Sequence, residues 1–142
     1  MKHARIVLSL LLLGSILAGC KQQSGSYQID NNSSFTLLRV KKYIWSKDWE
    51  RWLLVSRMPD CQRKYPLLDE SEFEEIKLYQ VDEGLYEVKD GSVAYLADLN
   101  NCAMAEQPKR TKPTGTLIGT FSDPKKDRIP FVAKPAKGTP AE

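Results

Sequence analysis

Between residues 75 and 99, apolar and polar side chains alternate, and the pair Asp90-Gly91 interrupts the alternation. Strict alternation places every second side chain on the same face, which is the pattern of a half-buried β-strand. The pattern predicts strands over residues 75–81, 85–89 and 92–99. Asp-Gly between such runs is a strong hairpin signal, and the expected type I′ turn needs positive φ at both central residues. We therefore expect three successive antiparallel strands. Their expected inward side chains in the hairpin are Tyr86, Val88, Val93, Tyr95, Ala97 and Leu99.

Residues 36–58 are open to two interpretations. The alternation from Leu37 to Ile44 fits a strand with a basic outer face, and residues 52–55 are apolar on both faces, as in a central strand. However, Trp45, Trp49 and Trp52 have helical spacing, so a helix beginning at Ser46 is the alternative. Strands are favoured, with Trp52 in the core. With a late edge strand over residues 116–121, the predicted fold is mainly β: a small antiparallel sheet of four to six strands.

The first 19 residues contain the three parts of a secretory signal. Lys2 and Arg5 form a basic start, an apolar run of 12 residues extends from Ile6 to Leu17, and two small residues precede Cys20. The apolar run is well short of the roughly 20 residues that a membrane-spanning helix needs. We therefore expect residues 1–19 to be a signal peptide that is removed on export.

The tetrapeptide Leu17-Ala18-Gly19-Cys20 resembles the lipobox of bacterial lipoproteins. This resemblance implies that the Cys20 thiol is diacylated, that cleavage occurs before it, and that the lipid attaches the protein to the bilayer. Two or more acyl chains suffice for stable anchoring. In enteric-type bacteria, an aspartate after the cysteine is associated with the inner membrane. For a chain from a Gram-negative bacterium, the resemblance with Lys21 in that place implies the inner leaflet of the outer membrane, with the domain facing the periplasm.

Two further cysteines, Cys61 and Cys102, remain after the signal is removed. An even number in an exported chain indicates a disulfide bond. A free thiol pair for redox chemistry is the alternative, although the spacing is not C-x-x-C. The loop between the cysteines spans about 40 residues, and closing it contributes on the order of 4 kcal/mol in the chain-entropy model. The segment Arg57-Met58-Pro59-Asp60-Cys61 also resembles small proteobacterial lipoproteins; this resemblance implies a fold and no activity.

The only histidine of the sequence, His3, lies within the signal. The mature chain therefore has no histidine for general acid–base catalysis, zinc binding or a catalytic triad. Removal of the signal also leaves 19 basic and 18 acidic side chains, which takes away the main support for nucleic-acid binding. We expect no catalytic residue, no metal and no cofactor. A histidine-free enzyme built on a Ser/Lys or carboxylate pair is the weakest alternative.

Composition divides the mature chain into three parts. Residues 20–34 are polar and are expected to form a lipidated flexible tether. Residues 35–102 hold all three tryptophans and are expected to form the β domain. Residues 103–142 hold six of the eight prolines and carry 8 basic and 4 acidic side chains, against 11 and 14 in residues 21–102. We therefore expect a basic, Pro-rich and mostly irregular tail, which is either an interaction tail or a solvated end.

The candidate binding surface consists of aromatic and basic side chains between residues 39 and 49. Trp45 and Trp49 flank the expected turn, where exposed aromatic rings could contact a glycan, a peptide or the membrane interface. Arg39 and Lys41 belong to a basic strip that could contact anionic lipid or peptidoglycan, or form salt bridges within the sheet.

Together these features predict a non-catalytic lipoprotein that is anchored in the cell envelope. Its expected partners are the lipid bilayer, through acylated Cys20, and an envelope protein or a cell-wall component. An inhibitor or immunity-type lipoprotein that acts on an envelope-targeting hydrolase is the alternative.

Overall fold

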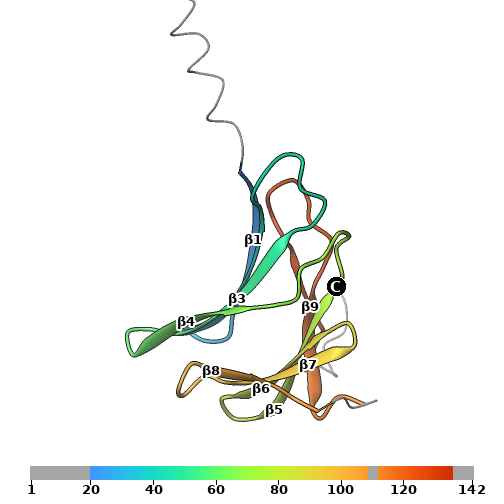
Figure 1. The fold of residues 1–142 in the computed structure, drawn as a ribbon. Coiled ribbons are helices and arrows are strands. Elements are labelled where there is room, and N and C mark those ends of the chain that lie inside the picture. The colour runs from blue at the N-terminus through green and yellow to red at the C-terminus, as the bar shows by residue number, and fades with distance from the viewer. Residues whose placement is uncertain (1–19, 109–111, 136–142) are drawn as a thin grey trace, which may run out of the picture.

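The computed structural model describes residues 20–108 and 112–135, which form β-strands and their connections (Figure 1). The strands form two antiparallel sheets, in the orders β1-β2-β3-β4 and β10-β9-β5-β6-β7-β8. The prediction of a mainly β, antiparallel fold is confirmed, but the strands are more numerous than expected and divide between two sheets. Their bounds are β1 Lys21–Gln28, β2 Ser33–Lys41, β3 Glu50–Arg57, β4 Cys61–Pro66, β5 Ile76–Asp82, β6 Leu85–Asp90, β7 Val93–Asp98, β8 Ala103–Glu106, β9 Thr116–Phe121 and β10 Phe131–Ala133.

The predicted hairpin is present as β6 and β7. Asp90 pairs with Val93, so Gly91 and Ser92 form the two-residue turn. Gly91 has a φ of +55°, and Ser92 does not share a positive φ. A type I′ turn needs positive φ at both central residues, so the expected turn type is wrong. Of the predicted inward side chains, Val93 is half-buried and the others are buried.

Residues 50–57 form a strand, as favoured, but its inward face differs from the prediction. Arg51 and Leu53 point into the protein, whereas Trp52 is half-buried on the other face. Lys64 Nζ lies 4.2 Å from the centroid of the Trp52 ring. Because successive side chains of a strand point to opposite faces, the inward Arg51 places Trp52 outside. The prediction that Trp52 belongs to the core is therefore wrong.

The segments that were expected to be a flexible tether and a mostly irregular tail both contribute strands. In place of a flexible tether, residues 21–28 form β1, whose backbone pairs with β2 from Lys21 opposite Lys41 to Gln28 opposite Ser34. Backbone hydrogen bonds to β2 hold β1 at the edge of the sheet. The strand therefore needs few apolar side chains. From the predicted tail, β8, β9 and β10 join the second sheet. The predicted strand over residues 116–121 is confirmed as β9, although it lies between β5 and β10 and not at an edge.

A cluster of buried apolar side chains lies between the two sheets. Phe35 of β2 and Tyr86 of β6 meet edge to face across the sheets, with 5.4 Å between the ring centroids. The Cys61–Cys102 disulfide adds a covalent link from the start of β4 to the turn before β8. The most deeply buried members of the cluster are Phe35, Leu37, Leu53, Val55, Ile76, Leu78, Val88, Cys102 and Phe121.

The backbone of β1 also passes very close to the segment before β10. The Ser24 amide donates to the Asp127 carbonyl at 3.1 Å, and the Ile129 amide donates to the Ser24 carbonyl at 2.8 Å. A Cβ atom at Gly25 would overlap the Ile129 carbonyl oxygen. Glycine is therefore required at residue 25 for the close approach of the two backbones.

We expect Gly25→Ala to lower the free energy of unfolding by about 1–3 kcal/mol, because the backbone must shift to admit the methyl group. Urea denaturation measures the change. Gln22→Ala, at an exposed position of the same strand, is the matched control and should stay within about 0.5 kcal/mol of wild type. Equal stability of the two variants would contradict the close approach at Gly25.

Candidate functional site

The predicted lipidation residue lies at one end of the molecule, immediately before the first strand. Cys20 is exposed, and its Sγ atom is 3.7 Å from the carbonyl oxygen of Lys42. Lys42 begins the loop that connects β2 to β3. The thiol is therefore accessible for modification and is adjacent to the loop that contains the predicted aromatic surface.

The predicted binding surface is divided by the structure. Trp45 is 76% exposed and stacks on Tyr43, with 5.0 Å between the ring centroids. In contrast, Trp49 is 8% exposed and Arg39 only 4%. The outward orientation that was predicted for Arg39 and Trp49 is therefore wrong, whereas Trp45 is on the surface. Lys41 lies between these cases, since it is half-buried.

Trp49 is covered by cationic side chains. The guanidinium carbon of Arg39 lies 4.4 Å from the centroid of the Trp49 ring, and the Nζ atoms of Lys41 and Lys21 lie 5.3 Å and 5.9 Å from it. Its backbone is also held, because the Trp49 amide donates to the Glu70 carbonyl at 2.7 Å. These contacts place Trp49 in the packing that fixes the β2–β3 loop to the sheet.

A buried network of charges lies beneath this end of the first sheet. Arg51 donates to both carboxylate oxygens of Asp90, at 2.9 Å each, and lies 3.3 Å from Glu70. Arg39 Nε lies 2.7 Å from Glu70 Oε1, and Arg39 Nη1 donates to Gln23 at 2.8 Å. The Arg39–Glu70 contact lacks hydrogen-bond geometry and is therefore an electrostatic pair. Two arginines thus face two carboxylates, and the bidentate Arg51–Asp90 pair links the two sheets.

Burial changes the ionisation of two members of this network. It raises the pKa of Glu70 above its ordinary value, against the opposing effects of the Glu74 amide and of Arg51 and Arg39. Burial also lowers the pKa of Arg39, and Glu70 acts in the opposite direction. Each charge is therefore destabilised by loss of water and is held by its partners, which makes the network sensitive to removal of any one member.

The alternation of inward and outward positions in the sequence indicates this network, but charged side chains are not expected at inward positions. The inward positions of β2 continue from Phe35 and Leu37 to Arg39. The inward positions of β3 lead back from Leu53 to Arg51, and those of β6 lead from Val88 to Asp90. Extending the alternation strictly would have placed all three charged side chains inside.

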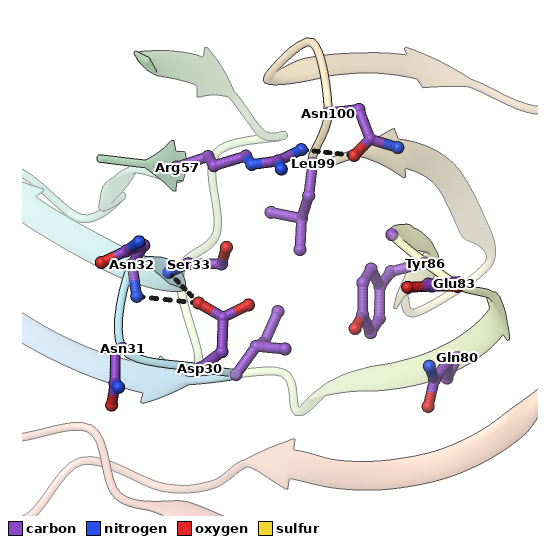
Figure 2. Close-up of a pocket in the computed structure, with 12 residues that line it drawn as sticks. Asp30, Asn31, Asn32, Ser33, Arg57, Gln80, Glu83, Tyr86, Leu99 and Asn100 are labelled. Carbon is purple, nitrogen blue, oxygen red and sulfur yellow. Dashed lines mark hydrogen bonds between the residues drawn. The ribbon is translucent and has the colours of Figure 1, made fainter. Parts of the chain in front are cut away.

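At the opposite end of β1, a cavity of about 520 Å³ opens between the two sheets (Figure 2). The turn between β1 and β2 forms one wall, where Asp30 Oδ1 accepts hydrogen bonds from the amides of Asn32 at 2.8 Å and Ser33 at 2.7 Å. The Asn32 amide is the main cause of the lowered pKa of Asp30. Arg57 donates to Asn100 across the opening. The other lining residues are Ile29, Asn31, Gln80, Glu83, Gly84, Tyr86 and Leu99.

This cavity is lined by hydrogen-bonding groups and by the apolar side chains of Ile29, Tyr86 and Leu99. Asparagine and glutamine amides, carboxylates and one guanidinium surround the side chains of Leu99 and Tyr86. Burial of Tyr86 raises the pKa of its hydroxyl, which therefore stays protonated. Such a lining suits a polar ligand or a polar segment of a partner. Sequence reasoning missed the cavity because its walls come from turns far apart in the chain.

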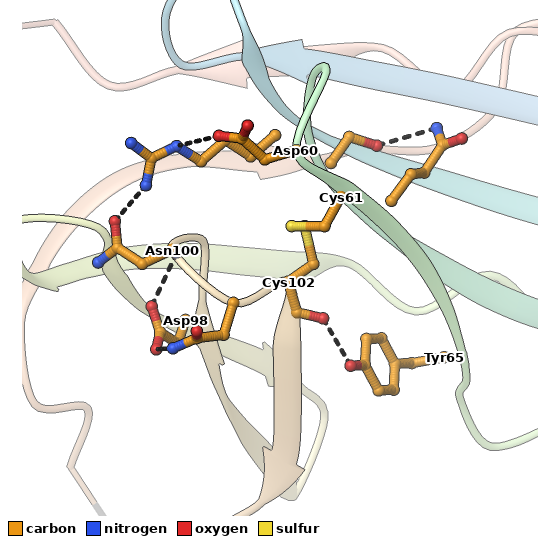
Figure 3. The surroundings of a disulfide bond; sticks show 10 residues. Asp60, Cys61, Tyr65, Asp98, Asn100 and Cys102 are labelled. Carbon is orange, nitrogen blue, oxygen red and sulfur yellow. Dashed lines mark hydrogen bonds and ion pairs between the residues drawn. A yellow bond between two sulfur atoms is a disulfide. The ribbon is translucent and has the colours of Figure 1, made fainter.

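The predicted disulfide is confirmed and lies beside this cavity (Figure 3). The Cα atoms of Cys61 and Cys102 are 6.0 Å apart. The Tyr65 hydroxyl donates to the Cys102 carbonyl at 2.6 Å, and Arg57 lies 3.8 Å from Asp60 in the same region. The disulfide and the Arg57–Asn100 contact together join the sheets at this end of the molecule.

Within residues 20–108 and 112–135, no three histidine, cysteine, aspartate or glutamate side chains are placed to hold a metal ion. The same part of the chain contains no helix that is long and apolar enough to cross a membrane. Comparison with known protein families, with curated proteins and with solved structures finds no match for this chain.

Proposed function

We propose that this protein is a lipoprotein of the cell envelope that is anchored through acylated Cys20 and acts by binding rather than by catalysis. The observation that carries the proposal is the lipobox-like tetrapeptide Leu17–Cys20, which follows a signal-like segment and ends at an exposed cysteine one residue before β1. Because the thiol is exposed and lies outside β1, acyl chains attached to it extend into solvent or lipid and displace no strand. The proposed location is the inner leaflet of the outer membrane, with the domain in the periplasm.

The position of the cavity supports a binding role. Strand β1 contains eight residues, which corresponds to about 26 Å at the usual rise per residue. Cys20 lies at one end of this strand, and the cavity wall formed by Asp30 to Ser33 lies beyond the other. An anchored domain therefore presents the cavity away from its attachment point, toward a protein or cell-wall partner. The polar lining favours recognition by hydrogen bonds.

The anchoring proposal is tested by Cys20→Ser. We expect this variant to accumulate as an unprocessed precursor that incorporates no radiolabelled or clickable fatty acid, because serine has no thiol to acylate. Mass spectrometry of the wild-type protein should show an N-terminus at Cys20 with the added acyl mass. Gln22→Ser, at an exposed position two residues later, is the matched control and should be labelled like the wild type. Lipid labelling of Cys20→Ser would overturn the assignment.

A further inference from the structure

The loop between β2 and β3 lies directly beside the proposed anchor. Across the first two strands, Lys21 is opposite Lys41, and the Cys20 thiol is 3.7 Å from the Lys42 carbonyl oxygen. Figure 1 shows this loop projecting at the end of the molecule where β1 begins. Any acyl chain on Cys20 therefore brings the β2–β3 loop to the bilayer surface.

This loop exposes a cluster of apolar side chains, Tyr43, Ile44 and Trp45. Ile44 is 71% exposed and Trp45 76%, and the Tyr43 and Trp45 rings stack with only 5° between their planes. Contiguous exposed apolar side chains are costly in water and mark interaction surfaces. Tyrosine and tryptophan are enriched at the membrane–water interface, where the ring body is apolar and its polar atom stays hydrated.

Lysine side chains flank the cluster in the sequence and on the neighbouring ends of β1 and β2. Lys21 and Lys42 are exposed and Lys41 is half-buried, and the loop itself adds Lys47. The acidic side chains at this end include Asp48 and Glu50, with Glu50 3.9 Å from Lys42 Nζ, and the β9–β10 loop contributes Asp123 and Asp127 together with Lys125, Lys126 and Arg128. The β9–β10 loop reaches the same end, where the Lys126 carbonyl accepts a hydrogen bond from Gln23 at 2.8 Å. Basic side chains therefore outnumber carboxylates at this end of the molecule, which suits the anionic headgroups of a phospholipid surface.

We propose that Tyr43, Ile44 and Trp45 insert into the headgroup region of the bilayer next to acylated Cys20, forming a second membrane contact. This inference rests on the proposed lipid anchor. The acyl chains supply the attachment, and the loop sets the orientation. Because β1 begins at Lys21, no spacer separates the anchor from the domain. The protein therefore stands on the membrane with β1 leading away from it and the cavity at the far end.

The test uses the acylated protein, reconstituted into vesicles of phosphatidylethanolamine and phosphatidylglycerol that contain brominated phospholipid. Brominated chains quench tryptophan fluorescence at short range. We expect strong quenching of the wild-type protein, loss of most of that quenching in Trp45→Ser, and fractional quenching at least as strong as that of the wild type in the matched control Trp52→Phe. Both variants should remain acylated and vesicle-bound. Thermal unfolding checks that Trp45→Ser, a change at an exposed position, is folded.

The outcomes separate the two proposals. If the protein is acylated and vesicle-bound but Trp45→Ser is quenched as strongly as the wild type, the loop contact is wrong and the anchor stands. If the purified protein carries no acyl chain, the anchor is wrong and the inference that rests on it falls too. Trp45 that is unquenched by brominated lipid but shielded from acrylamide by soluble peptidoglycan fragments would assign the loop to the cell wall instead.

Discussion

Replacing Arg51 with alanine is expected to lower the free energy of unfolding by about 3–5 kcal/mol, which is the usual consequence of removing one partner from a buried ion pair. Arg51 donates to both oxygens of Asp90 and contacts Glu70, and all three side chains are buried. Alanine leaves the Asp90 carboxylate without its cation in a site from which water is excluded. It also removes one of the two arginines that offset the charge of Glu70. Chemical denaturation, followed by circular dichroism, measures the loss.

Two further variants show that the effect comes from the charge network. Arg63→Ala removes an exposed arginine from the neighbouring strand β4 and should change the free energy of unfolding by no more than about 0.5 kcal/mol. The double variant Arg51→Met, Asp90→Leu removes both charges of the bidentate pair. It should be more stable than Arg51→Ala, because no carboxylate is left without its partner at residue 90. If Arg51→Ala matches Arg63→Ala, the network contributes nothing measurable.

Strands β5, β6 and β7 of the second sheet were the most predictable part of the fold. Their apolar side chains alternate strictly, and Gly91 marks the turn, so local sequence was sufficient for β5, β6 and β7. Strand β1 was missed for a physical reason. It lies at the edge of its sheet, and its stability comes from backbone pairing with β2 and from the close approach at Gly25. Neither interaction requires the apolar alternation by which strands are recognised.

The candidate site was less predictable than the fold. Because isolated charges are rarely buried, the sequence favours an exposed Arg39 and indicates no inward position for Arg51. Their burial depends on partners that are distant in sequence, such as Asp90, which lies 39 residues beyond Arg51. The cavity was also not predictable, because its walls come from three turns that are far apart in the sequence. By contrast, exposure of Trp45 followed from its place beside a turn, which is a local property.

Loss of the Cys61–Cys102 disulfide is expected to lower the free energy of unfolding by about 4 kcal/mol in the chain-entropy model, within a usual range of about 2–5 kcal/mol. The sequence separation of 41 residues sets this value, since the crosslink restricts the unfolded chain. The bond joins the two sheets beside the cavity, so its loss should also loosen that end of the fold. Cys102 is fully buried, and Cys61→Ala, Cys102→Ala is therefore preferred to serine, which would add an unpaired hydroxyl to the core.

Two measurements check this. Thermal and urea unfolding of the double alanine variant should match those of the wild-type protein treated with a phosphine reductant, since both lack the crosslink, and the reductant should have no effect on the variant. Thiol titration of the denatured, non-reduced, acylated protein should detect no free thiol at either cysteine. Two titratable thiols would show that the sheets are not covalently joined. In that case the Arg51–Asp90 pair and the apolar cluster would have to hold them together.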